Sequence, residues 1–201
     1  MNSPRLRLLL VRHGEAESNR HGRFLGRTDS PLTARGKVQV RSLADVMVEE
    51  SLVAIYTSPL RRAFETAKTI ALHHPCPLHV DDRLLEQDFG RWEGLTFEEA
   101  TQRFPDDFAA WQADAVLSGP TGGEILPQVV NRIVNLYNEI SSKHGSETVL
   151  MVAHGGVINA LLCALLQTPL RWLWAYRLQP GALCEVLIYE KSAVLSQLNC
   201  I

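Results

Sequence analysis

Short apolar runs alternate with amphipathic stretches along most of the chain. The runs are typical of strands buried on both faces of a sheet, and they occupy residues 6–11, 53–57 and 148–153, with a shorter one at 78–80. Between them, apolar positions at helical spacing predict helices over residues 33–50, 58–73, 129–140 and 157–167. Residues 183–189 and 193–198 close the chain as two further predicted strands.

Alternation of strands and helices with short connections is typical of an α/β fold. We expect a three-layer α/β/α sandwich with a mostly parallel central sheet, in which the last two strands can pair antiparallel at one edge. Residues 81–120 depart from the pattern, because they combine glycines and acidic pairs with many aromatic side chains. They predict a loop and short helices that form a cap over the carboxyl-terminal edge of the sheet. Since no repeat or linker divides the chain, we expect one domain over residues 1–201, with 81–120 as its cap insertion.

Composition and charge exclude several classes of protein. Hydrophobic residues make up 46% and charged residues 21% of the 201 positions, which is ordinary for a globular chain and excludes disorder. Twenty basic against 22 acidic residues leave a net charge of -2, so nothing predicts binding to nucleic acid or to an anionic membrane. Four scattered cysteines and the lack of a long apolar run predict a soluble, cytoplasmic protein. A homodimer through the last two strands or residues 170–176 stays open.

Two of the predicted strands end in the same unusual way, with a histidine followed by glycine. The first strand leads into Arg12-His13-Gly14, and the strand at 148–153 leads into His154-Gly155-Gly156. The carboxyl ends of parallel strands share one edge of a sheet, where ligands bind, so both imidazoles are expected in one crevice. A single histidine at a strand end is as often structural as functional. The repeated pattern favours a functional pair.

Arginines accompany these histidines. Arg12 precedes His13, and Arg61 and Arg62 open a predicted helix that follows a strand. Guanidinium groups bind phosphate through paired hydrogen bonds, and the amides of a helix N-terminus add further donors. Arg61 and Arg62 taken alone are more typical of solvated surface charges. Their nearness to the paired histidines is what favours an anion site.

The histidines and arginines belong to an ordered series of motifs over residues 8–156. The series consists of Arg12-His13-Gly14-Glu15 with Ser18-Asn19, Gly26-Arg27-Thr28-Asp29, Leu32-Thr33-Ala34-Arg35-Gly36, Ser58-Pro59-Leu60-Arg61-Arg62-Ala63, Leu85-Glu86, Phe89-Gly90-Arg91-Trp92-Glu93-Gly94, Gly122-Gly123-Glu124 and Ala153-His154-Gly155-Gly156. In this order the motifs resemble those of the histidine phosphatase family, also called the phosphoglycerate mutase-like superfamily.

The resemblance implies that His13 is a nucleophile that takes a phosphoryl group onto its imidazole. Attack requires a ring nitrogen without a proton, for example because the other N–H donates to a backbone carbonyl. Arg12, Arg62 and His154 would surround the transferred group and balance its charge. Further substrate or phosphate contacts are implied for Asn19, Gly26 and the amide of Gly156.

A leaving alkoxide needs a proton, and the resemblance implies that Glu86 supplies it. Burial under the cap or nearness to the substrate's charge would favour the protonated acid, which could later accept a proton from the attacking water. By sequence position alone Glu15, Asp88 and Glu93 are rivals. The Leu85-Glu86 motif before Phe89-Gly90 favours Glu86.

No metal-ligand motif or cofactor-binding loop stands out, so we expect no metal and no cofactor. The length and the cap sequence resemble the short phosphatase branch, which includes alpha-ribazole phosphatases and broad-specificity phosphatases. We therefore expect metal-independent hydrolysis of a small phosphorylated metabolite, with alpha-ribazole 5'-phosphate as the specific candidate. A 2,3-bisphosphoglycerate-dependent mutase and a non-catalytic, protein-binding regulator remain alternatives. Trp172 and Trp174 are expected to pack rather than to contact a ligand.

Overall fold

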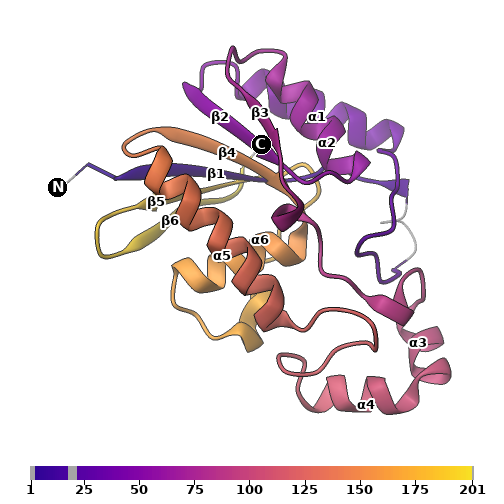
Figure 1. Cartoon of the computed structure of the whole chain (residues 1–201). Helices are drawn as coiled ribbons and strands as arrows, with labels where there is room; N and C mark the ends of the chain where they lie inside the picture. Colours follow the sequence, from indigo (N-terminus) through magenta and orange to yellow (C-terminus); the bar gives the residue numbers. More distant parts are fainter. Residues whose placement is uncertain (1–2, 18–21, 201) are drawn as a thin grey trace.

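A six-stranded sheet forms the centre of the computed structural model, which describes residues 3–17 and 22–200 (Figure 1). The strand order is β3-β2-β4-β1-β5-β6. The strands are β1 (Leu6–Arg12), β2 (Leu52–Thr57), β3 (Leu78–Val80), β4 (Thr148–Ala153), β5 (Leu183–Ile188) and β6 (Ala193–Cys200). The first four are parallel, whereas β5 runs antiparallel to both β1 and β6. The predicted fold class is confirmed, including the antiparallel pair at one edge.

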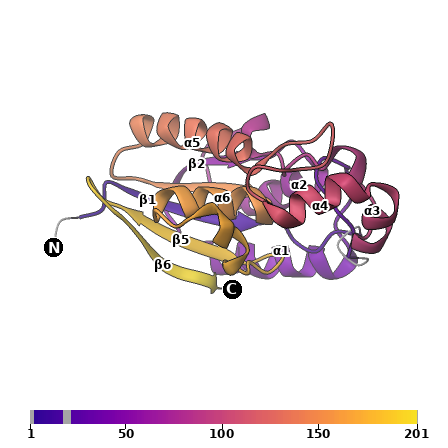
Figure 2. The same cartoon turned by 90° about the horizontal axis from the view of Figure 1, so that it is seen from below.

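Helices cover both faces of this sheet (Figure 2). One face carries α1 (Ala34–Val46) and α2 (Arg61–Ala71), and the other carries α5 (Leu126–Lys143) and α6 (Gly155–Leu165). Alternate residues of β1 explain this, because Leu8 and Leu10 pack toward α5 and α6, while Leu9 and Val11 pack toward α1 and α2. The continuous apolar run Leu8–Val11 of this central strand is therefore buried by a helix layer on each side.

The loop after β1 is fixed against the start of α1. Thr33 caps this helix by accepting a hydrogen bond from the Gly36 N–H, and its hydroxyl donates to the Glu15 carboxylate. A Cβ added at Gly36 would lie 2.0 Å from the Glu15 carbonyl oxygen, so only glycine permits this approach. The residues that follow the first strand are thus held directly beside the sheet edge.

The cap lies over the carboxyl-terminal end of the parallel strands (Figure 1). It contains the short helices η2 (Asp82–Leu84), η3 (Gly90–Trp92), α3 (Phe97–Arg103) and α4 (Pro105–Ala113). Trp92, Ala100 and Phe108 form its own apolar core, with Phe24 and Trp111 packed against it. Opposite the cap, η4 (Leu170–Ala175) leads into β5. In the part of the chain that the structure describes, no helix is long and apolar enough to cross a membrane.

Candidate active site

Two histidines meet where β1 and β4 end. The parallel ladder pairs Arg12 with Ala153, so the next residue of each strand, His13 and His154, reaches the same point of the sheet edge. Their ring centroids lie 5.0 Å apart with an interplanar angle of 62°, and both side chains are buried. The structure therefore brings the two sequence-predicted imidazoles into contact.

The His13 ring is fixed in one tautomer. Its Nδ1 lies 2.7 Å from the carbonyl oxygen of Gly14. Because a carbonyl oxygen only accepts, the proton sits on Nδ1 and the lone pair remains on Nε2. Burial, followed by the charges of Arg62 and Arg12, holds the pKa of His13 well below its ordinary value. The ring is thus neutral, with a nucleophilic Nε2.

His154 has the opposite tautomer. Its Nδ1 accepts a hydrogen bond from the Arg62 Nε–H at 3.2 Å, so the proton lies on Nε2, which donates to the Ser58 hydroxyl at 2.9 Å. Burial and then the neighbouring His13 and Arg62 lower its pKa well below the ordinary value. Ser58 is a buried site residue that the sequence placed in a motif without assigning it a role.

Two arginines, the buried Arg62 and the half-buried Arg12, supply positive charge to the site. Arg62 is completely buried, and its two Nη atoms donate to the carbonyl oxygens of Gly26 and Thr28. Arg12 donates to the Leu178 carbonyl at 2.6 Å, while its buried Nε has no partner among the described residues. Burial lowers the pKa of both guanidinium groups. Neither guanidinium forms an ion pair within residues 3–17 and 22–200, so a bound anion would supply the counter-charge that both lack.

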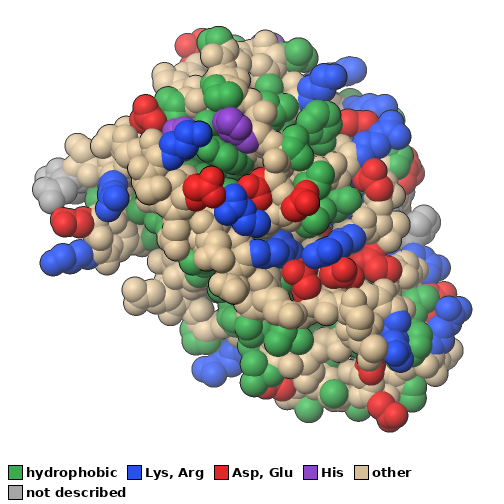
Figure 3. Space-filling model, in the orientation of Figure 1, with side chains coloured by type: hydrophobic (Ala, Val, Ile, Leu, Met, Phe, Trp, Pro, Cys, Tyr) green, Lys and Arg blue, Asp and Glu red, His purple; other side chains and the backbone are tan. Residues whose placement is uncertain are grey.

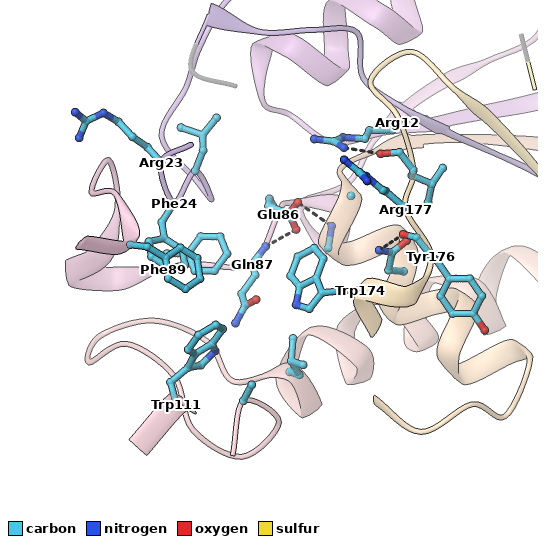
Figure 4. A pocket seen from close by; sticks show the side chains of 18 residues that line it. Arg12, Arg23, Phe24, Glu86, Gln87, Phe89, Trp111, Trp174, Tyr176 and Arg177 are labelled. Atoms are coloured by element: carbon cyan, nitrogen blue, oxygen red, sulfur yellow. Dashed lines mark hydrogen bonds between the residues drawn. The ribbon is translucent and has the colours of Figure 1, made fainter. Parts of the chain in front are cut away.

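Glu86 supplies the one carboxylate at the site within the described chain (Figure 4). Its Oε2 accepts from the Gly156 N–H at 2.9 Å, and its Oε1 accepts from Val157 and Gln87. A Cβ at Gly156 would lie 2.5 Å from Oε1, so glycine at the start of α6 permits the close approach. The helix N-terminus thus holds the acid beside Arg12.

The rival carboxylates have other partners. Glu93 accepts hydrogen bonds from the backbone at residues 26–28 and from Phe89, and Asp88 pairs with Arg27. Glu15 accepts from the Thr33 hydroxyl. None of the three lines the cavity described below, whereas Glu86 does.

Three predicted substrate contacts remain predictions. Asn19 lies outside the described residues. The Gly26 N–H donates to Glu93 and its carbonyl accepts from Arg62, so this residue organises the loop behind the site. The Gly156 N–H is directed at the site but donates to Glu86.

A cavity of about 470 Å³ opens beside Arg12, Glu86 and Gly156, between the cap and the segment that follows η4. His13, Arg62 and His154 lie behind this part of the site and are not among its lining residues. Aromatic side chains dominate it, and Figure 4 shows Phe89 and Trp111 on the cap side and Trp174 on the other. The prediction that Trp172 and Trp174 pack is wrong, because they are 58% and 59% exposed and only Leu173 between them is buried. Trp174 lines the cavity, whereas Trp172 does not.

Two neutral, buried histidines make stability depend on pH. Their pKa values are lower in the folded than in the unfolded protein, so the unfolded chain binds more protons below the ordinary histidine pKa of about 6.5. We expect the unfolding free energy to be highest above that pH. As the pH falls further, the unfolding free energy should decrease by about 1.4 kcal/mol per pH unit for each histidine. Urea titrations from pH 5 to 8 measure this slope. His13→Gln should reduce the slope, and an unchanged slope would contradict the buried neutral state.

Fold and site together define a class, that of α/β proteins with paired histidines and arginines at the carboxyl edge of a parallel sheet. Residues 8–201 match the family described as Histidine phosphatase superfamily (branch 1). The chain belongs to this superfamily and is a phosphoric monoester hydrolase. The motif-based recognition is confirmed.

Several relatives cover nearly the whole chain. Phosphoserine phosphatase 1 of Hydrogenobacter thermophilus is 35% identical over 194 residues, which are 96% of this chain and 92% of the relative. The adenosylcobalamin/alpha-ribazole phosphatase of Salmonella typhimurium is 31% identical over 194 residues, or 96% of each chain. The crystal structure of the alpha-ribazole phosphatase from Shigella flexneri aligns with a TM-score of 0.90 at 31% identity and also covers 96% of each chain. The chain is therefore similar to phosphatases with two different named substrates.

Proposed function

We propose that the protein hydrolyses a small phosphomonoester through a phosphohistidine at His13, without a metal ion. The observation that carries this proposal is the neutral His13 ring, whose Nε2 lone pair lies in a site with the buried Arg62 and the half-buried Arg12, neither of which forms an ion pair among the described residues. Nε2 attacks phosphorus and the ester P–O bond breaks. Arg12, Arg62 and His154 stabilise the charge on the transferred oxygens, a task that a metal ion performs in other phosphatases.

Glu86 is the proposed acid and base of the two steps. As the ester bond breaks, the protonated carboxyl gives its proton to the leaving alkoxide. Water then attacks phosphorus, the P–N bond breaks, and the carboxylate accepts the proton of the water as inorganic phosphate leaves. Its position at the cavity wall beside Arg12, with no other carboxylate lining the described cavity, supports this assignment.

The cavity favours a leaving group that carries an aromatic ring. Trp174 and the cap aromatics offer flat apolar surfaces on opposite sides, which suits stacking of a ring between them. Alpha-ribazole 5'-phosphate, an alkyl phosphate whose alcohol carries a benzimidazole, has this chemistry, and the named activity of the Salmonella relative supports it. For phosphoserine, Arg23 and Arg177 could meet the carboxylate, but among the described lining residues only Glu86 is an acid that could meet the ammonium.

A substrate panel with two tryptophan variants tests the substrate class. In EDTA we expect phosphate release, with kcat/KM at least about 10-fold higher for alpha-ribazole 5'-phosphate than for phosphoserine, because ring stacking contributes roughly 1 kcal/mol or more. Trp174→Ala should lower the alpha-ribazole value by about 10-fold and change the phosphoserine value little. Trp172→Ala is the matched control, since this equally exposed neighbour does not line the cavity.

Each alternative predicts a different result in the same panel. A higher kcat/KM for phosphoserine would make the protein a phosphoserine phosphatase and reject the aromatic preference. Transfer of the phosphoryl group to a phosphoglycerate rather than to water would indicate a mutase. No release from any ester by the folded protein would support a binding protein, and inhibition by EDTA would reject the metal-free mechanism.

A further inference from the structure

The segment that carries Glu86 has little regular structure to hold it in place. Glu86 lies between η2 and η3, and residues 86–89 belong to no helix or strand. A proton donor must nevertheless be held within about 0.5 Å of its productive position. The helix N-terminus of α6 fixes the carboxylate oxygens, but the backbone of the segment needs support from another part of the fold.

Arg132 on α5 provides this support with all of its hydrogen-bond donors. Its Nη1 donates to the carbonyl oxygens of Arg83 and Leu85, at 2.8 and 2.6 Å, and its Nη2 donates to the carbonyl of Glu86 itself at 3.1 Å. Nε and Nη2 also bind the two carboxylate oxygens of Glu124, at 2.9 and 3.1 Å. The planar guanidinium has five N–H groups, and five acceptors surround it.

Glu124 completes the support from the other side. Its Oε2 accepts from the Asp88 N–H, its carbonyl accepts from the Gln87 side chain, and its own N–H donates to the Asp88 carbonyl. Although burial opposes the charged form, hydrogen bonds from Arg132 and the Asp88 N–H lower the pKa of Glu124. The Arg132 and Glu124 side chains are each only 15% exposed, so water competes little for these bonds.

We propose that Arg132, held by Glu124, is a positioning residue that sets the place of Glu86 for proton transfer to the leaving group. This inference rests on the proposed function, because it assumes that Glu86 is the acid. Arg132 does not line the cavity and therefore acts through the peptide backbone of Glu86 rather than on the substrate. On the face shown in Figure 3, acidic and basic side chains gather in a band across the middle of the molecule.

A pair of aromatic esters separates positioning from a general structural role. Benzyl phosphate releases an alkoxide that needs a proton, whereas p-nitrophenyl phosphate releases a phenolate that does not. We compare kcat/KM, which reports formation of the phosphoenzyme and excludes the later attack of water. For benzyl phosphate we expect a loss of about 10²-fold in Glu86→Gln and of about 10-fold to 10²-fold in Arg132→Ala, and for p-nitrophenyl phosphate less than about 3-fold in either.

The double variant makes the test decisive. If Arg132 acts through Glu86, then Glu86→Gln with Arg132→Ala should be no slower on benzyl phosphate than Glu86→Gln alone, within about 2-fold. If the loss of kcat/KM in the double variant is instead the product of the losses in the two single variants, the proposal is overturned. An equal loss on both esters in Arg132→Ala would overturn it as well. Equal losses of Glu86→Gln on both esters would instead reject the acid assignment, and with it the proposed mechanism.

Two further variants guard against simple loss of folding. Arg132→Lys keeps the charge but cannot reach five acceptors, so its loss on benzyl phosphate should be intermediate and confined to that ester. Arg83→Gln is the matched control, because the Arg83 guanidinium also ties this segment to α5, through Glu139, without binding the Glu86 peptide. It should keep the wild-type ratio of the kcat/KM values for the two esters. A shifted ratio would show that any loosening of the segment slows proton transfer, and would contradict a specific role of Arg132.

Discussion

His13→Ala should abolish turnover of every phosphomonoester while leaving the fold intact. The imidazole is the only protein group in the proposed mechanism that forms a bond to phosphorus, so its removal takes away the covalent route rather than a part of the charge balance. We expect kcat/KM to fall by at least about 10⁴-fold, as is usual when a nucleophile is deleted. Alanine leaves a small cavity at the end of β1, where the buried ring of His154 remains as a neighbour.

Circular dichroism and initial rates of phosphate release check this result together. His144→Ala is the control, because His144 is also buried and hydrogen-bonded, to the Tyr56 hydroxyl at 3.0 Å, but its ring packs against Tyr56 and not against the histidine pair of the site. The control should keep the activity of the wild type. A His13→Ala protein that retains more than about 1% of the activity with a native spectrum would assign the nucleophile elsewhere.

Arg62→Ala should reduce both activity and stability. The wild-type guanidinium stabilises the transferred phosphoryl group, and loss of an arginine in this role costs roughly 10³-fold in kcat/KM or more. The variant also leaves the carbonyl oxygens of Gly26 and Thr28 and the Nδ1 of the buried His154 without their donor. We expect the unfolding free energy to fall by about 2 to 4 kcal/mol.

The same variant should change the pH profile in a defined direction. Arg62 is one cause of the low pKa of His13, after burial, so its removal raises that pKa. Because His13 attacks only when neutral, the acid limb of kcat/KM should move to higher pH. Arg61→Ala is the matched control, because Arg61 is the next residue along the chain but its side chain is exposed and pairs with Glu65. This variant should leave the rate, the stability and the pH profile unchanged. A shift of the acid limb to lower pH would contradict the electrostatic role of Arg62.

Much of the fold could be predicted from the sequence because each signal is local. Apolar runs such as Leu8–Val11 indicate buried strands, and the helical periodicity that follows indicates helices with one buried face. The carboxyl ends of parallel strands lie at the same edge of the sheet. His13 and His154 could therefore be paired before their distance was known. The choice of Glu86 over Glu93 as the acid depended on the family motif. The structure adds a physical reason, because the Glu93 carboxylate already accepts hydrogen bonds from the backbone N–H groups of residues 26–28.

Other site residues carry no local signal. Arg132 lies on the polar side of an amphipathic helix, as a solvated arginine would. Three of its five acceptors come from a segment nearly 50 residues away in sequence, and the other two belong to Glu124. Trp174 was expected to pack because tryptophan is usually buried, but the 3-10 turn Leu170–Ala175 buries Leu173 instead and leaves the indole facing the cavity. Such roles depend on tertiary contacts that periodicity does not encode.

Trapping the covalent intermediate tests the central claim most directly. Wild-type protein is mixed with p-nitrophenyl phosphate, quenched in alkali within the first turnover, and digested for mass spectrometry, because the P–N bond of a phosphohistidine survives alkali and breaks in acid. One phosphoryl group on the peptide that contains His13, absent from His13→Ala, is the result that we expect. Rapid phosphate release with no phosphorylated His13 peptide would show that water attacks the substrate directly and would contradict the phosphohistidine mechanism.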